Sequence, residues 1–274
     1  MSKSERDDEE AASGSGPGLL MVQSVEKAFS VLNVIGSAQG PMSLAQVTAA
    51  TGMGKSAAQR FIHTLATLGY IERYQNTPTW VLSVKVLELS NYYINSSDFI
   101  KRAQPYLVHL SKETEETVNL TVLDGTEIVF ISRYPSRHVL ATDVVIGTRM
   151  PAYCSAPGIA MMARLDEGEV ERLLAASELT AYTPSTTCAL PALREKIRLS
   201  AARGYATAFE EYYLGDLSIA APIVDNAGRP VGAINVAVSR ARYTPEEAEA
   251  RFAGPVVAAA QAASHHRVPT RLLA

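Results

Sequence analysis

The sequence predicts an α+β protein in which a small helical domain is followed by a larger domain built on a β-sheet. Apolar residues recur at helical spacing through residues 24–68, and from residue 117 onward β-prone runs alternate with short helices. The chain has 274 residues, 47% of them hydrophobic, which is enough to fill one core in each domain.

Residues 1–18 are predicted to form a disordered tail because they are acidic and rich in glycine and serine. They lack the basic start and apolar core of a signal peptide, and the chain has no apolar run long enough to span a membrane. The two cysteines, Cys154 and Cys188, are too few for a disulfide framework and lie in no metal-ligand spacing. We therefore expect a cytoplasmic protein without a membrane span, bound metal or cofactor.

Residues 19–83 are predicted to form a domain that begins with helices. The first helix, residues 24–38, follows a cap at Ser24, and its apolar stripe comprises Val25, Ala28, Phe29, Val31, Leu32 and Ile35. Ser43 and Gln46 have the spacing of a capping box, which predicts a second, short helix.

The third predicted helix runs from Lys55 to Leu68, and the short turn that starts at Gly52 gives the spacing of a helix-turn-helix. Its apolar face comprises Ala58, Phe61, Ile62, Leu65 and Leu68. Beyond Gly69, the runs "YIERY" and "TWVLS" alternate apolar and polar residues around "QNTP", which predicts a hairpin. Three helices followed by a hairpin make a winged helix-turn-helix.

Residues 84–97 are predicted to form a linker helix, and residues 98–274 the second domain. That domain starts with a helix over residues 98–116, in which Pro105 either starts a new segment or kinks the helix. Asp124-Gly125 then joins two β-prone runs into a hairpin. The further predicted elements are strands at 139–145, 205–210, 218–224 and 231–238, and helices at 155–163, 167–176, 191–202 and 245–264.

The polar face of the third helix suits double-stranded DNA. It comprises Lys55, Ser56, Gln59, Arg60 and His63, with Ala57 small and exposed among them. Arginine and glutamine make paired hydrogen bonds to purine edges, lysine binds phosphate, and alanine allows close approach to a thymine methyl. Residues 19–82 carry four basic and two acidic side chains in a chain of net charge −3. A solvated helix face is the alternative, but the position before a wing favours DNA.

Four runs stand out along the chain: "QSVEKAFSVLNVIG", "SLAQVTAATGMGKSAAQRFIHTLATLGYIER", "PAYCSAPGIAMMA" and "RGYATAFEEYYLGDLSIAAPIVDNAGRPVGAINVAVS". Together they closely resemble the IclR family of bacterial transcription regulators, and the resemblance covers nearly the whole chain after residue 20. It implies a winged helix, a linker helix that pairs the DNA-binding domains, and a C-terminal GAF-like effector domain with an antiparallel sheet flanked by helices. It also implies a homodimer or homotetramer that represses from a palindromic operator.

The resemblance matches the third helix to the family's recognition helix, so Ser56, Ala57, Gln59 and Arg60 are expected to contact bases or the groove. Wing residues are expected to touch phosphate or the minor groove, and these are Arg73, Gln75 and Asn76. A small ligand is expected between the sheet and "PAYCSAPGIAMMA". The candidate effector-binding residues are Tyr153, Cys154, Ser155, Ala156, Pro157, Glu211, Tyr212, Tyr213, Ser218 and Asn235.

Several of these positions differ from the family members that bind glyoxylate or pyruvate. Such members resemble Gly-Ala where this chain has Ala156-Pro157, and Pro157 has no N–H to offer a carboxylate. Ala208 replaces an acidic residue, and Asn235 and Ala237 replace serines. The remaining aromatic and amide groups favour an aromatic acid or phenolic derivative, with an aliphatic keto acid as the alternative. For each tyrosine, a place in the core or at a dimer interface is equally open.

An enzyme is the alternative from a different class, since Cys154 or Ser155 beside a helix start could host a nucleophile. No supporting base is evident, because the spacing of His109, His138, His265 and His266 pairs none of them with those residues. The sequence also has no phosphate-binding glycine loop and no nucleophile elbow. We therefore predict no catalysis. A DNA-binding scaffold without a ligand is a third reading.

Overall fold

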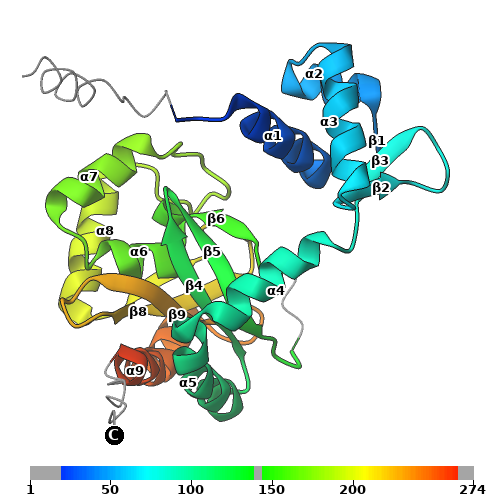
Figure 1. Ribbon diagram of the computed structural model, residues 1–274. Helices are drawn as coiled ribbons and strands as arrows, with labels where there is room; N and C mark the ends of the chain where they lie inside the picture. Colours follow the sequence, from blue (N-terminus) through cyan, green and yellow to red (C-terminus); the bar gives the residue numbers. More distant parts are fainter. Residues whose placement is uncertain (1–19, 139–143, 265–274) are drawn as a thin grey trace, which may run out of the picture. The chain divides into compact units, whose positions relative to one another are not determined.

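The computed structural model describes residues 20–138 and 144–264, which form two compact units, one ending at Tyr93 and the other beginning at Ile94 (Figure 1). The predicted tail at residues 1–18 lies outside the described residues. Most of the predicted strand at 139–145 and the histidine pair near the chain end also lie outside them, and Val144 and Val145 are not in a strand.

The first unit is a three-helix domain with a small sheet, as predicted. Its elements are α1 (Gln23–Ser37), β1 (Met42–Ser43), α2 (Leu44–Thr51), α3 (Lys55–Thr67), β2 (Ile71–Arg73) and β3 (Thr79–Leu82). The sheet order is β1-β3-β2 with antiparallel pairing, and β1 is an addition to the predicted hairpin. The core is formed by Val31, Ile35, Val47, Ile62, Leu65 and Ile71.

The helix signals of the first unit are confirmed except at the start of α1. Ser43 and Gln46 form the predicted capping box of α2, and Gly52 ends that helix in the left-handed conformation at φ 67°. The predicted Ser24 cap is wrong. Helix α1 already begins at Gln23, so the extended cap conformation falls on Val22, whose side chain makes no capping hydrogen bond.

Three residues assigned to apolar faces are exposed instead of buried. Val25 and Phe29 on α1 are 52% and 55% exposed, and Leu68, just after α3, is 53% exposed. The small core reaches only the later turns of α1 and the middle of α3, so the outlying members of each stripe have nothing to pack against within the unit.

Helix α4 (Val86–Ser96) contains the boundary between the two units, and α5 (Asp98–Thr114) follows it directly. Ser97 caps α5 by accepting a hydrogen bond from the Ile100 amide at 3.3 Å. Pro105 lies inside α5, which continues through it as one helix, so Pro105 does not start a new segment.

The second unit is built on a six-stranded antiparallel sheet with the order β6-β5-β4-β9-β8-β7. The strands are β4 (Thr117–Asp124), β5 (Glu127–Tyr134), β6 (Arg149–Pro151), β7 (Ala206–Phe209), β8 (Asp216–Val224) and β9 (Pro230–Ser239). The helices after α5 are η1 (Ala152–Cys154, a 3-10 turn), α6 (Ala156–Met162), α7 (Glu167–Ala176), α8 (Leu190–Arg203) and α9 (Pro245–Ser264). β6 and η1 are additions to the predicted elements.

The two faces of this sheet have different chemistry. Helices α5 and α9 cover one face, where Val118 and Leu120 of β4 join their hydrophobic core (Figure 1). Helix α6 covers the other face, and there β4 presents Asn119 and Thr121, both buried. Buried amides on a sheet face need partners, and these partners define the candidate ligand site described below.

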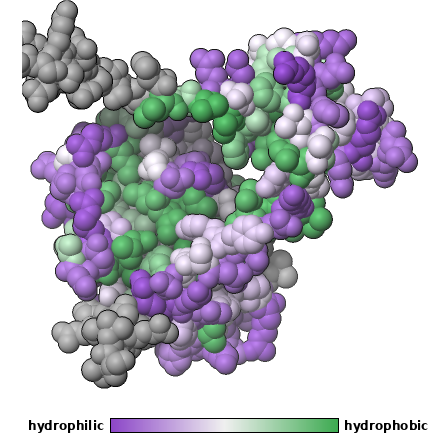
Figure 2. All heavy atoms as spheres, viewed as in Figure 1, coloured by the Kyte–Doolittle hydropathy of each residue, from purple (hydrophilic) through white to green (hydrophobic). Residues whose placement is uncertain are grey.

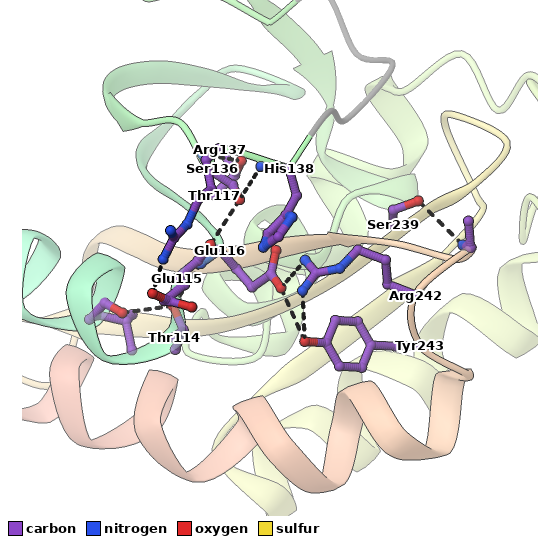
Figure 3. Close-up of polar contacts among 12 residues, drawn as sticks. Thr114, Glu115, Glu116, Thr117, Ser136, Arg137, His138, Ser239, Arg242 and Tyr243 are labelled. Atoms are coloured by element: carbon purple, nitrogen blue, oxygen red, sulfur yellow. Dashed lines mark hydrogen bonds and ion pairs between the residues drawn. The ribbon is translucent and has the colours of Figure 1, made fainter.

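A buried glutamate anchors the start of β4. Glu116 is 1% exposed, and its Oε1 accepts hydrogen bonds from the Arg242 guanidinium and, at 3.2 Å, from the Tyr243 hydroxyl (Figure 3). Nearby, the Ser136 amide donates to Thr117 Oγ1 at 3.0 Å. These contacts hold together the α5–β4 junction, the segment after β5 and the β9–α9 connection.

Candidate effector pocket and nucleic-acid interface

A cavity lies between the sheet face under α6 and the segment that links β7 to β8. It measures about 40 Å³, which is room for about three water molecules. Nine of the ten predicted effector residues line it, namely Cys154, Ser155, Ala156, Pro157, Glu211, Tyr212, Tyr213, Ser218 and Asn235. Ala208 and Ala237, which mark the departures from the keto-acid binders, line it as well.

Tyr153 does not line the cavity. Its ring is fully buried, and its hydroxyl donates to the Thr180 carbonyl at 2.6 Å while accepting from the Thr180 amide at 2.8 Å. Burial raises the pKa of this phenol. Both hydrogen bonds fasten the segment after α7 to η1, so the structure gives Tyr153 a place in the core.

A row of polar side chains crosses the sheet on the cavity side. Arg133 Nη1 donates to Asn119 Oδ1 at 2.9 Å, and Asn119 Nδ2 donates to Asn235 Oδ1 at 3.3 Å. Asn235 Nδ2 in turn donates to Ser218 Oγ at 3.0 Å. The row connects β5, β4, β9 and β8, so each amide is held in one orientation at the cavity wall.

Arg133 reaches the cavity because of a β-bulge. The pairing of β4 with β5 joins Thr121 to Phe130 and Leu120 to Ser132, which leaves Ile131 as an extra residue. In a regular strand, residues 130 and 133 point to opposite faces. The extra residue puts both Phe130 and Arg133 on the cavity side. Alternation along a regular strand would instead predict that Arg133 lies on the opposite face from Phe130.

Asp216 also lines the cavity and was not among the predicted residues. It lies two residues before Ser218 on β8, which places both on one face. Its Oδ1 is buried and accepts no hydrogen bond from the described residues. Burial raises the pKa of Asp216 to about 7, although the positive charge of Arg133 acts in the opposite direction.

Glu211 is held by ionic and backbone contacts. Its Oε1 pairs with the Lys196 ammonium from α8, and its Oε2 accepts from the Thr187 amide at 3.4 Å. The Thr186 hydroxyl donates to the Glu211 carbonyl at 2.6 Å. Glu211 therefore fixes the β7–β8 segment to the segment before α8, and its charge is already compensated.

The groups considered as nucleophiles are not activated in this structure. Burial raises the pKa of Cys154 to about 12, so the thiol stays protonated at neutral pH. The Ser155 hydroxyl caps α6 by accepting from the Gly158 amide at 3.2 Å and donates to the Ala152 carbonyl at 3.2 Å. No histidine of the described residues lines the cavity.

Aromatic rings stand at one side of the cavity. The Tyr182 and Tyr212 ring centroids are 4.6 Å apart, and Tyr212 meets Tyr213 edge-to-face at 4.7 Å. The next residue, Leu214, is 71% exposed. Glu210, which opens this segment, has a positive φ of 57°, a conformation that non-glycine residues seldom adopt.

The predicted DNA-binding residues lie on α3 and the wing. Lys55, Ser56, Gln59, Arg60 and His63 are exposed along α3. Within the described ranges, neither Lys55 nor Arg60 forms an ion pair with a carboxylate. Ala57 is half-buried beside α1, contrary to the expected exposure.

The wing is a tight hairpin between β2 and β3. Its tip residues Gln75 and Asn76 both have positive φ, at 44° and 61°. Arg73 lies with its guanidinium carbon 5.0 Å from the Trp80 ring centroid, a stacking that restrains this long side chain.

The described part of the chain contains neither a candidate metal-binding cluster nor a candidate membrane-spanning helix. No group of three or more metal-ligating side chains comes together there. No helix in that part combines the length and apolar character needed to cross a membrane.

A winged helix-turn-helix joined to a sheet domain with a ligand cavity defines a ligand-responsive transcriptional regulator. Family models agree: "IclR helix-turn-helix domain" matches residues 24–74, and "Bacterial transcriptional regulator IclR C-terminal" matches residues 91–265. The chain belongs to the IclR family.

Curated and structural relatives support this assignment. The Pca regulon regulatory protein of Pseudomonas putida is 30% identical, with 88% of this chain and 83% of the relative covered. The transcriptional repressor IclR of Escherichia coli (strain K12) is 27% identical over 91% of this chain and 92% of its own length. The crystal structure of Thermotoga maritima IclR matches with a TM-score of 0.69 at 26% identity, covering 88% of this chain and 97% of that one.

Proposed function

We propose that this protein is a cytoplasmic repressor that binds operator DNA through residues 19–83 and a small organic acid through residues 98–274, with residues 84–97 as the linker. The observation that carries the DNA-binding part is the exposed face of α3, whose Lys55 and Arg60 form no ion pair with the described residues, in a helix-turn-helix that precedes a wing. The protein acts by binding and not by catalysis.

An aromatic acid or phenolic derivative is the effector that the lining favours. Arg133 offers a positive charge for a carboxylate, and Phe130 and Tyr212 offer flat apolar surface. The small cavity favours an aliphatic keto acid as the second candidate. A benzoate-sized guest would require the Tyr212–Leu214 segment to move outward. Tyr212 and Tyr213 are only partly buried against the core, and Leu214 is exposed.

The proposed repressor is a homodimer or homotetramer on a palindromic operator. Exposed apolar side chains on single elements support self-association: Met21, Val22, Val25 and Phe29 lie on or just before α1, and Leu87 and Tyr92 lie on α4 (Figure 2). Exposed apolar side chains that gather on one surface are typical of surfaces that pair with another subunit. A two-fold dimer would in turn place two α3 helices on two half-sites.

The Arg60→Ala variant tests the role of α3. If Arg60 reads a guanine, its removal costs about 1–3 kcal/mol of specific DNA binding, which is a loss of roughly five- to 150-fold in affinity. The operator is first selected from a pool of random duplexes, and affinity is then measured by fluorescence anisotropy at fixed salt.

The matched control is Lys101→Ala, which removes an exposed positive charge from α5 of the second unit. It is expected to leave DNA affinity within about twofold of wild type. If Arg60→Ala binds the selected duplex as tightly as this control, Arg60 does not read the operator.

A further inference from the structure

Asp216 and Arg133 place an orphan acceptor and a cation in the same cavity. Asp216 Oδ1 is buried without a hydrogen-bond donor from the described residues. Arg133 donates from Nη1 to Asn119, and it forms no ion pair with Asp216 in the described chain. Because buried polar atoms are nearly always satisfied in native proteins, an orphan oxygen at a cavity wall points to a bound partner.

Among the described residues, the acidic and basic groups that line the cavity leave two charges uncompensated, those of Arg133 and Asp216. Glu211, from the β7–β8 segment, also lines the cavity, but Lys196 of α8 neutralises it. Glu210, the first residue of the same segment, forms an ion pair in which its Oε2 lies 3.9 Å from Arg240 Nε. Of these two charges, Arg133 stays positive near neutral pH, and Asp216 is the one that changes with pH.

The remaining titratable groups at the wall are a thiol and two phenols. Burial raises the pKa of Cys154 to about 12 and raises the pKa of Tyr212 above its usual range. The Cys154 thiol and the Tyr212 hydroxyl therefore stay neutral around pH 7. The second phenol at the cavity wall is that of Tyr213.

An organic anion changes the charge balance of this cavity. If the anion enters beside Arg133 while Asp216 is ionised, the cavity holds one uncompensated negative charge, which a low-dielectric site opposes strongly. If Asp216 is protonated, the anion and Arg133 balance, and the carboxyl O–H becomes a donor aimed at the anion. With a pKa of about 7 for Asp216, the protonated form is readily reached near neutral pH.

We propose that the Arg133 guanidinium and the protonated carboxyl of Asp216 together bind the carboxylate of the effector, so that binding takes up a proton from solvent wherever Asp216 is ionised beforehand. This inference rests on the proposed organic-acid effector. It adds that a carboxylate is the recognised group, and that the signal reaching the DNA-binding domain depends on pH as well as on effector concentration.

The test uses benzoate and pyruvate as probes with the full-length protein, because each stays a monoanion through the pH range used. Isothermal titration calorimetry measures affinity between about pH 6 and about pH 9. For wild type, affinity is expected to be flat below pH 7 and to fall about tenfold for each pH unit above it. Titrations in two buffers of different ionisation enthalpy report uptake of about half a proton per site at pH 7.

The Asp216→Asn variant keeps the shape and mimics the neutral acid, so it is expected to bind with the same affinity at every pH and more tightly than wild type at about pH 9. Arg133→Gln is expected to lose binding at every pH while its unfolding midpoint stays near that of wild type. Thermal unfolding of both variants checks that they fold.

The possible results separate the two proposals. If a probe binds wild type with the same affinity at every pH, the proton-coupled proposal is wrong. It is also wrong if binding to the Asp216→Asn variant still depends on pH. In either case the proposal of a regulator that responds to an organic acid stands. If neither acid binds wild type at any pH while the selected duplex still does, the organic-acid effector itself is wrong.

Discussion

Replacing Gly158 by alanine is expected to destabilise the second unit by about 3 kcal/mol or more. A Cβ built on Gly158 lies 2.2 Å from the Ala152 carbonyl oxygen and 2.5 Å from the Ala152 Cα. Neither atom can move without displacing the η1 backbone, because η1 leads directly into α6 and its residues are buried. The same displacement would disturb Ser155 at the cavity wall.

Gly254→Ala is the matched control, since this glycine also lies inside a helix, α9, but a Cβ there meets nothing within 4 Å. Alanine is the better helix former, so this variant is expected to be more stable by about 0.5–1 kcal/mol. Urea unfolding monitored by circular dichroism measures both. A Gly158→Ala protein as stable as wild type would show that η1 and α6 are not packed as described.

The Lys196→Met variant is expected to lose about 3 kcal/mol of stability, because it leaves the Glu211 carboxylate buried without its partner. The Lys196 and Glu211 side chains are 17% and 8% exposed, so water cannot replace the lost contact fully. Adding Glu211→Gln to this variant is expected to recover much of the loss, since the uncompensated charge is then gone.

Arg194→Met, two residues away on α8, is the control for an exposed ion pair. Arg194 binds Glu171 at 2.6 Å, but their side chains are 48% and 41% exposed. Its loss is expected to cost less than about 1 kcal/mol. Equal effects of the two substitutions in denaturant unfolding would contradict the buried role of Lys196.

The sequence predicted the fold well where a short motif of neighbouring residues favours a single backbone conformation. The Ser43 and Gln46 capping box and the Asp124-Gly125 hairpin were both confirmed, because each depends on residues next to one another in the chain. Val25 and Phe29 were placed wrongly because helical spacing shows which residues share a face, but not how far a small core extends.

The cavity was predictable in outline but not in its charge. Most of its lining came from the resemblance to a family, whereas Arg133 was missed because the bulge at Ile131 reverses the alternation of β5. Asp216 shares a face with Ser218, and that spacing was visible in the sequence. Its burial was not, because it depends on how α6 and the β7–β8 segment cover the sheet.

A ligand-responsive repressor must couple acid binding in the cavity to DNA binding by α3. The most direct measurement of this coupling is the affinity for the selected duplex with and without a saturating acid that binds the cavity. Wild type is expected to change its DNA affinity by roughly five- to 150-fold, and Arg133→Gln is expected to show no change. An acid that binds the cavity of wild type yet leaves its DNA affinity unchanged would contradict the account.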